Sequence, residues 1–380
     1  MESIQTLDAR LQTGSNDHWL RSQSWDLTWV ILSSCAVVLP FLSYELFTYL
    51  LSFASIRNFL GVHPRDVLDV SRNTVNGIIA LLIGGPHMYA TYTRTFLDGG
   101  YRREHTRMLA ASLLIPCFVI FSGIFYFQFL VTIFFFAASL HVMEQAGYVV
   151  GCYAEKSGKR ASNYSRYLEY IVVFSSLYPI ALWRMVDGTF RIGQIELLIP
   201  RFILLEHNPF IGYSLVTVVS VIFAASYTLW LLKSYAEYKS GSLNIPKFLF
   251  VFLTATITFI IPAYHELDVA FQGLNTWHSI QYLGLTWYVN VARKKREGAR
   301  KNSIVDRISD EQKGWKFYFF NVGIAASTVA LVGVMLFTRS YTGFTFDQAY
   351  YIVILSVLLM HYLHDHYLFK EYHAVVPSQS

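Results

Sequence analysis

The chain has few charged residues, and this shortage limits the classes of protein to which it can belong. Charged residues make up 14% of the 380 positions, well below the roughly 25% that is usual in soluble domains. Hydrophobic residues make up 54% and aromatic residues 17%. A chain of this composition is expected to lie in a membrane, with no separate soluble domain.

Cysteine is also scarce, which bears on disulfides and metal sites. Cys35, Cys117 and Cys152 fall in or beside apolar segments and have no CxxC spacing, so neither a disulfide framework nor a thiolate metal site is expected. The first 24 residues lack a hydrophobic stretch followed by a cleavage site, so no cleaved signal peptide is expected. The net charge of +5 comes from basic residues in short loops, which indicates membrane topology and not nucleic-acid binding.

Ten apolar segments have about the 20 residues that a transmembrane helix needs. The sequence therefore predicts an all-α, polytopic membrane helical bundle. It comprises a polar cytoplasmic segment (1–24), a single transmembrane domain (25–370) and a cytoplasmic tail (371–380). The predicted spans are Trp25–Phe47, Val75–Leu97, Arg107–Phe125, Gln128–Cys152, Tyr167–Asp187, Ile211–Lys233, Lys247–His265, Ala270–Ala292, Trp315–Thr338 and Gln348–Lys370.

The basic residues set the expected orientation. With ten spans and a cytoplasmic N-terminus, most of the 30 lysines and arginines fall on the inner side, as the positive-inside rule requires. Both termini are then cytoplasmic, and the bacterial inner membrane is the expected location. Segments Ile56–Asn73 and Thr189–Pro209 on the outer side are amphipathic enough to lie along the interface.

Four of the twelve histidines lie near the middle of four predicted spans that all run in the same direction. Each is within three residues of its span's centre, or about 5 Å at 1.5 Å rise per residue. An ionisable side chain in hydrocarbon is costly and marks a functional site by default. Each histidine could instead bond only to a neighbouring helix, but four at one depth predict a metal site in the bundle core. The four are His87, His141, His278 and His361.

Of the polar residues that follow a span histidine by three or four positions and so share its helix face, three are selected. They are Glu144, Gln281 and Asp365. A ligating imidazole passes its other N–H to such a group, so these three are the predicted catalytic or tuning residues, and the two carboxylates could also bind metal. His265, in an outer His-Glu-Leu-Asp turn, and His364, on the face of the last span histidine, are further candidate ligands.

The string Gly84-Gly85-Pro86 directly precedes His87. Glycine and proline inside a span break the backbone ladder, which is tolerated beside a cavity. The sequence therefore predicts a kink that opens space for a substrate next to the histidine layer. The predicted substrate contacts are Tyr89, Arg94, Trp277 and Tyr282, with an anionic lipid headgroup as an alternative ligand of the arginine.

The Gly-x-Pro-His string at 84–87, the spaced intramembrane histidines and a late His…Asp resemble the Brp/Blh family. Members of that family are all-helical membrane enzymes that cleave β-carotene into retinal with non-heme iron held by histidines. The resemblance covers four short patches and implies that the four span histidines are the iron ligands, in chain order. The chain departs from the family at Thr91, where the family has aspartate, and after His141, where Val-Met replaces Phe-Gly.

These patterns together predict an integral membrane non-heme iron oxygenase or oxidoreductase. Its cofactor would be Fe(II), which an imidazole set with open positions suits. Its partners would be the lipid bilayer, O₂ and a hydrophobic lipid or isoprenoid substrate, with any electron donor left open. The alternatives are a b-type haem electron carrier, a metal or proton transporter and a lipid hydrolase or transferase with zinc-activated water.

Overall fold

The structure is a computed structural model that describes residues 18–157, 163–192, 195–300, 303–338 and 343–376. Most of these residues are helical and very few are in strands, which confirms the all-α prediction. The α-helices are α2 (Gln23–Asp26), α3 (Val38–Ser52), α4 (Ala54–Phe59), α5 (Val67–Ile79), α6 (Gly85–Arg94), α7 (Gly99–Glu104), α8 (Thr106–Ser112), α9 (Leu114–Phe125), α10 (Phe127–Lys156), α11 (Asn163–Ser176), α12 (Tyr178–Val186), α13 (Pro209–Lys239), α14 (Ile245–Ile260), α15 (Leu267–Glu297), α16 (Ile304–Ile308), α17 (Gly314–Phe337), α19 (Phe346–Leu368) and α20 (Tyr372–Val375).

Short π and 3₁₀ segments and one small hairpin complete the described elements. The hairpin pairs β1 (Arg191–Ile192) with β2 (Ile195–Glu196) in antiparallel fashion. The π segments are η1 (Leu27–Ile31) and η4 (Ala80–Gly84), and the 3₁₀ segments are η2 (Leu32–Val37), η3 (Pro64–Asp66), η5 (Arg201–Ile203) and η6 (Ile261–Ala263).

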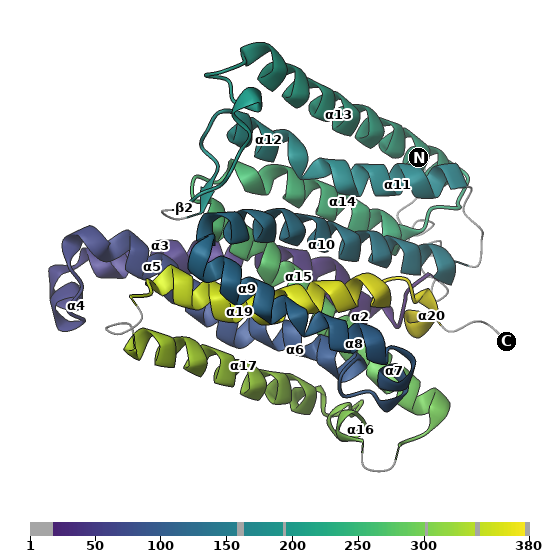
Figure 1. Cartoon of the computed structure of the whole chain (residues 1–380). Coiled ribbons are helices and arrows are strands. Elements are labelled where there is room, and N and C mark those ends of the chain that lie inside the picture. Colours follow the sequence, from purple (N-terminus) through teal and green to yellow (C-terminus); the bar gives the residue numbers. More distant parts are fainter. Residues whose placement is uncertain (1–17, 158–162, 193–194, 301–302, 339–342, 377–380) are drawn as a thin grey trace.

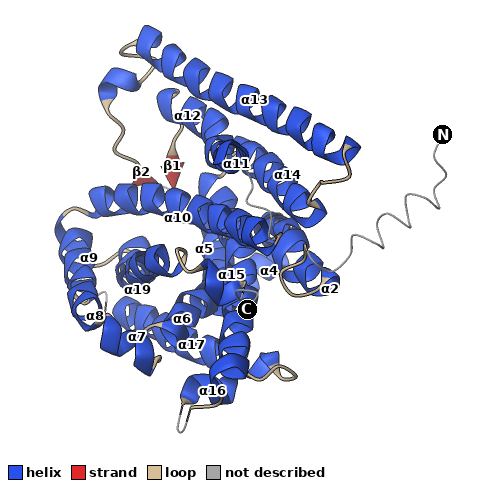
Figure 2. Ribbon diagram, turned by 90° about the vertical axis from the view of Figure 1, so that its right-hand side faces the viewer, coloured by secondary structure: helices blue, strands red, loops and turns tan. Residues whose placement is uncertain are grey.

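The long helices run roughly parallel, with α13 at one edge of the bundle and α17 at the other (Figure 1). Helices α2, α7, α16 and α20 gather at one end, while α4 and the hairpin lie at the opposite end (Figure 1). Figure 2, which looks nearly along the helices, shows α15 near the centre, close to α10, α6, α17 and α19. The helices that carry the four predicted ligands are therefore neighbours in the middle of the bundle.

Eight helical segments of the described residues are long and apolar enough to cross a membrane. This supports a membrane-embedded protein, and each segment coincides with one predicted span. The eight are Gln23–Ser52, Pro64–Arg94, Thr106–Phe125, Phe127–Lys156, Pro209–Lys239, Ile245–Ala263, Gly314–Phe337 and Phe346–Leu368.

The other two predicted spans are helical but less apolar or less continuous. Segment Tyr167–Asp187 is divided between α11 and α12 near Pro179, which has no N–H to continue the helical hydrogen bonding. Segment Ala270–Ala292 lies inside α15, whose 31 residues span about 46 Å. Its mean hydropathy is low because buried polar side chains cross the bundle core. The membrane crossing of these two segments stays a prediction.

The termini and outer segments are described in part. Most of the predicted segment 1–24 lies outside the described residues. The predicted tail contains α20, which packs against α10 and α15. Of the two segments expected along the interface, one carries α4 and η3 and the other carries the hairpin and η5. Their position relative to a bilayer stays a prediction.

The backbone irregularity predicted before His87 is present. A π turn, η4, separates α5 from α6, which has Pro86 in its first turn. Proline cannot bond the carbonyl four residues earlier, and the Leu82 carbonyl instead accepts a 2.8 Å hydrogen bond from the Tyr318 hydroxyl. A Cβ at Gly85 would overlap the Ala80 carbonyl and a side chain of α17. Glycine and proline therefore set the direction in which His87 enters the core.

Candidate metal centre

Four buried imidazoles from four helices meet in the middle of the bundle. His87 (α6), His141 (α10), His278 (α15) and His361 (α19) are each at most 4% exposed. Each ring has two of the others as neighbours, at centroid distances of 4.6 to 5.0 Å. The predicted depth of the four residues therefore corresponds to a single cluster.

The facing nitrogens of His87 and His361 show which tautomer each ring has. His87 Nδ1 lies 2.5 Å from the Gly84 carbonyl oxygen, so this nitrogen carries the hydrogen. His361 Nδ1 lies 2.6 Å from the Thr91 hydroxyl, whose own hydrogen points to Asp365. Both Nε2 atoms therefore carry lone pairs, yet they are 3.0 Å apart. A bound metal ion or a shared proton between the two nitrogens would satisfy both lone pairs.

Several other polar atoms of the cluster have no hydrogen-bond partner among the described residues. They are both ring nitrogens of His141, both of His278, and Oδ2 of Asp365. An unsatisfied buried polar atom costs about 1–3 kcal/mol, and one bound cation would satisfy one such atom on each of these residues.

The spacing of these atoms also fits an ion. Two nitrogens bound at about 2.1 Å to one tetrahedral ion lie about 3.4 Å apart. Two groups of three residues share His361, and within each group the donor atoms all lie within 4.8 Å of one another. The first adds His87 and His278, and the second adds His141 and Asp365. The donor set therefore fits a transition-metal ion held by imidazoles and one carboxylate.

Asp365 is held in place by two hydroxyl groups. Its Oδ1 accepts hydrogen bonds from the hydroxyls of Tyr282, at 2.6 Å, and Thr91, at 2.9 Å. Its Oδ2 lies 3.8 Å from His141 Nε2 and 3.5 Å from His361 Nδ1. One oxygen is thus fixed, while the other is available to a metal or a proton.

Three predicted site residues lie apart from this cluster. The Glu144 carboxylate instead pairs with His366 at 2.5 Å, on a partly exposed surface. His265 is exposed in the outer turn, where its ring lies against Tyr264. His364 is buried, and its Nε2 lies 3.2 Å from the Ser112 hydroxyl.

The other predicted residues surround the cluster in different ways. Tyr282 belongs to it through Asp365. The Gln281 amide donates to the Val30 carbonyl at 2.7 Å and accepts from Gln145, so it ties α15 to η1 and α10. Tyr89 bonds to Thr328 of α17, Arg94 pairs with Glu371 at 3.4 Å, and Trp277 is buried in the main hydrophobic core.

Two residues of the site were not selected from the sequence. Thr91 contacts His361, Asp365 and Tyr282, and Ser279 lies 2.9 Å from His87 Nδ1. Thr91 follows His87 by four positions and so shares its helix face. Asp365 was selected because it follows His361 by four positions. The same spacing identifies Thr91 if hydroxyl side chains are considered together with carboxylates.

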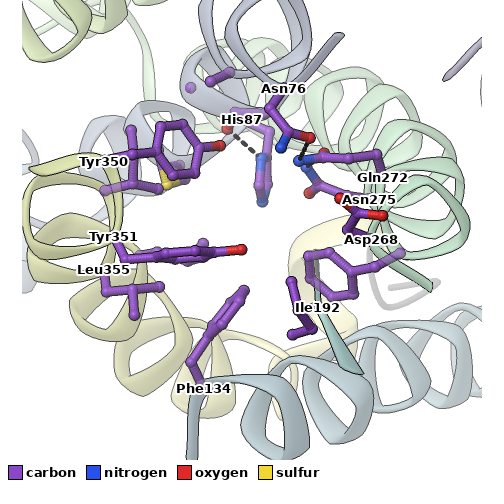
Figure 3. Close-up of a pocket in the computed structure, with 17 residues that line it drawn as sticks. Asn76, His87, Phe134, Ile192, Asp268, Gln272, Asn275, Tyr350, Tyr351 and Leu355 are labelled. Carbon is purple, nitrogen blue, oxygen red and sulfur yellow. Dashed lines mark hydrogen bonds between the residues drawn. The ribbon is translucent and has the colours of Figure 1, made fainter. Parts of the chain in front are cut away.

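Two cavities approach the cluster. A cavity of about 40 Å³ reaches His87, and Figure 3 shows this ring projecting into it, with Tyr351 and Phe134 on the far wall. A larger cavity of about 170 Å³ has almost wholly apolar walls from α10, α12 and α15. Phe271 lines both cavities, so this one ring stands between the apolar cavity and the space beside His87.

The chain matches no protein-family model, and no curated protein or solved structure is significantly similar to it. The resemblance to the Brp/Blh family therefore remains an expectation that depends on the four sequence patches alone.

Proposed function

We propose that the chain is a membrane-embedded non-heme iron oxidoreductase that uses O₂ to oxidise a hydrophobic lipid or isoprenoid substrate. The observation that carries this proposal is the meeting of four buried imidazoles, two of which turn lone pairs toward each other at 3.0 Å. Imidazole ligands with open positions suit ferrous iron. When bound, iron would supply the O₂ chemistry.

The residues beside the metal would control protons and exclude water. Asp365 is fully buried, and its second oxygen could accept or return a proton next to His141 and His361. Tyr282 and Thr91 would hold this carboxylate in one orientation. The aromatic rings that stack on His141, from Tyr362 and Phe369, would close the site to water.

The cavities favour a hydrophobic substrate. The apolar cavity between α10, α12 and α15 offers a path for a hydrocarbon chain from the bilayer, because apolar pockets bury apolar ligands. Phe271 would have to turn aside to admit the chain to His87. The space of about 40 Å³ beside His87 admits a small molecule but no porphyrin, which favours non-heme iron over haem.

The test is the metal content and optical spectrum of the purified protein. We expect about one iron per chain and no haem absorption. His87→Ala and His278→Ala should each lose most of the iron, while the matched variant His265→Ala should keep it. Unchanged iron content in both core variants, or an intense haem absorption band, would overturn the proposal. O₂ consumption with extracted membrane lipids would then identify the substrate.

A further inference from the structure

Parallel aromatic rings lead from the metal centre toward the end of the bundle that holds α20. Phe369 stacks on His141 with ring centroids 5.7 Å apart, and Tyr148 stacks on Phe369 at 5.2 Å. Tyr372 stacks on Tyr148 at 5.4 Å. The planes of successive rings differ by 19° to 27°. We call Phe369, Tyr148 and Tyr372 the ring series.

The ring series lines a cavity of about 520 Å³ between α10, α11, α20 and the residues that directly follow α19. This volume is within the roughly 300–1,000 Å³ of small-molecule sites. Gly151 of α10 shapes the wall, since a Cβ there would overlap the Tyr372 ring. All three rings of the series line the cavity, together with Glu144, Gly147, Arg166, Tyr167, Tyr170, Phe174 and Lys370.

Polar side chains at the cavity can form hydrogen bonds with the oxygen atoms of a planar ring in a ligand. The Arg166 guanidinium lies over the rings of Tyr170 and Tyr372. Its Nε donates to the Tyr170 hydroxyl at 3.1 Å, and the side chain is one of those that line the cavity. Glu144 pairs with His366 at 2.5 Å, and both side chains are partly exposed to solvent. Glu144 therefore joins the wall of the cavity to the solvent-exposed surface.

The cavity lies at a depth that lipid-soluble molecules occupy. Tyr148 is seven residues after His141 on α10, or about 10 Å along the helix. Tyr164 and Tyr167 near the start of α11 are about two-thirds exposed, which is typical of the aromatic belt at a membrane interface. An occupant of this cavity would therefore come from the edge of the bilayer.

We propose that this cavity binds a lipid-soluble quinol and that the ring series carries its electrons to the metal centre. A quinol offers a flat ring for aromatic walls, oxygens for Arg166 and an apolar tail for the bilayer. The inference rests on the proposed function and narrows it to oxidations in which one oxygen atom of O₂ becomes water.

The electron and proton balance of such a reaction closes with one quinol. The quinol loses two protons, which pass to water at the exposed side of the cavity, and two electrons, one at a time through the ring series, and becomes a quinone. These two electrons, two protons taken up at the metal centre, one O₂ and one substrate C–H bond give a hydroxylated substrate and one water. A dioxygenase, by contrast, would need no electrons from a donor.

Binding is tested first, with the full chain in lipid nanodiscs and a short-tailed ubiquinone as the probe. We expect quenching of the intrinsic fluorescence with a micromolar Kd, and at least tenfold weaker binding to Arg166→Gln. Tyr164→Leu is the matched control, since this exposed tyrosine of α11 lies outside the cavity walls. Equal binding to both variants would overturn the site, and so would an absence of saturable binding. Metal-free protein should bind equally well, so this arm is independent of the proposed function.

Electron delivery is tested next, by adding the quinol to the iron-loaded ferric protein without oxygen. We expect the ferric optical and paramagnetic signals to disappear, at least tenfold more slowly in Tyr148→Leu than in Tyr164→Leu. Dithionite should reduce all variants alike, which would show that the iron is intact. Equal quinol rates in both variants would overturn the ring series as the route. A protein without redox-active metal would instead refute the proposed function.

Discussion

Thr91 stands one helical turn after His87, and its hydroxyl touches three side chains of the site. It donates to Asp365, accepts from His361 Nδ1 and lies 2.7 Å from the Tyr282 hydroxyl. It therefore fixes both the tautomer of a candidate ligand and the orientation of the carboxylate. A group of this kind affects metal affinity without touching the metal.

Replacement of Thr91 by valine should weaken metal binding by about 10- to 100-fold. Valine keeps the shape but leaves His361 Nδ1 and one carboxylate bond unsatisfied. The measurement is the rate at which a chelator removes iron from the purified protein. Thr95→Val is the control, because among the described residues the Thr95 hydroxyl bonds only the Thr91 backbone carbonyl, at 3.0 Å. Equal rates for both variants would contradict the role of Thr91.

Asp98, beyond the end of α6, is a charged group whose effect depends on pH. Burial raises its pKa, but the Tyr101 backbone N–H and the guanidinium groups of Arg293 and Arg300 outweigh burial and hold the pKa below its ordinary value. A carboxylate of lowered pKa stabilises the fold above its unfolded pKa of about 3.9, and this stabilisation is lost as the pH falls through the folded pKa.

Asp98→Asn should therefore lower the free energy of unfolding by about 2 kcal/mol at neutral pH. The difference from the parent protein should stay constant between about pH 8 and 5 and shrink only below about pH 4. Thermal unfolding in detergent at several pH values measures it. A difference that already fades between pH 7 and 5 would show that the pKa of Asp98 in the folded protein lies above its ordinary value.

Residue spacing shows how far the sequence could predict the site. Depth along a helix follows from position at 1.5 Å per residue, so four histidines could be predicted to share a level. The direction in which a side chain points is harder to predict, because residues three and four positions after a histidine both lie near its helix face. Asp365 turns to the cluster, while Glu144 turns to His366 and the partly exposed cavity. That difference depends on how each helix is rotated by its packing.

At the scale of the element, the position of the irregular segment between α5 and α6 could be predicted correctly from the sequence. Two glycines and a proline predicted a break before His87, and a π turn is present there. The opposite holds for α15, whose polar residues lower its hydropathy although they are buried against other helices. Hydropathy depends on residue types alone and not on their surroundings. It therefore underestimates the tendency of a helix surrounded by other helices to cross the membrane.

Gly85→Ala should destabilise the protein by about 1–3 kcal/mol, because the added methyl group meets a carbonyl and α17. It should also lower metal content, since His87 would shift with the turn. Gly77→Ala is a matched control on α5, where a Cβ would meet nothing within 4 Å, and it should be neutral or slightly stabilising. Thermal unfolding and metal analysis of both variants measure the two effects. Similar behaviour of the two would contradict close packing at the turn.

At the scale of the whole molecule, loops that are expected on opposite sides of the membrane lie at opposite ends of the bundle (Figure 1). The loops that carry many of the predicted cytoplasmic basic residues, around α7 and α16, lie at one end of the bundle, and α4 and the hairpin lie at the other (Figure 1). Apolar composition predicted the membrane bundle, because length and hydropathy suffice for that. The contacts between helices far apart in the sequence, such as α6 with α15 and α19, could not be predicted from any single segment.

The membrane crossing of α15 is one of the two crossings on which the predicted ten spans still depend, and cysteine labelling in cells can test it. In a chain whose three native cysteines are replaced by serine, His265→Cys should react with a membrane-impermeant maleimide in intact cells. Glu297→Cys, at the other end of α15, should react only after permeabilisation. Both side chains are exposed, so accessibility in the folded protein is comparable. Labelling of both from one side would mean that α15 does not cross, and the four imidazoles would then not lie at mid-membrane.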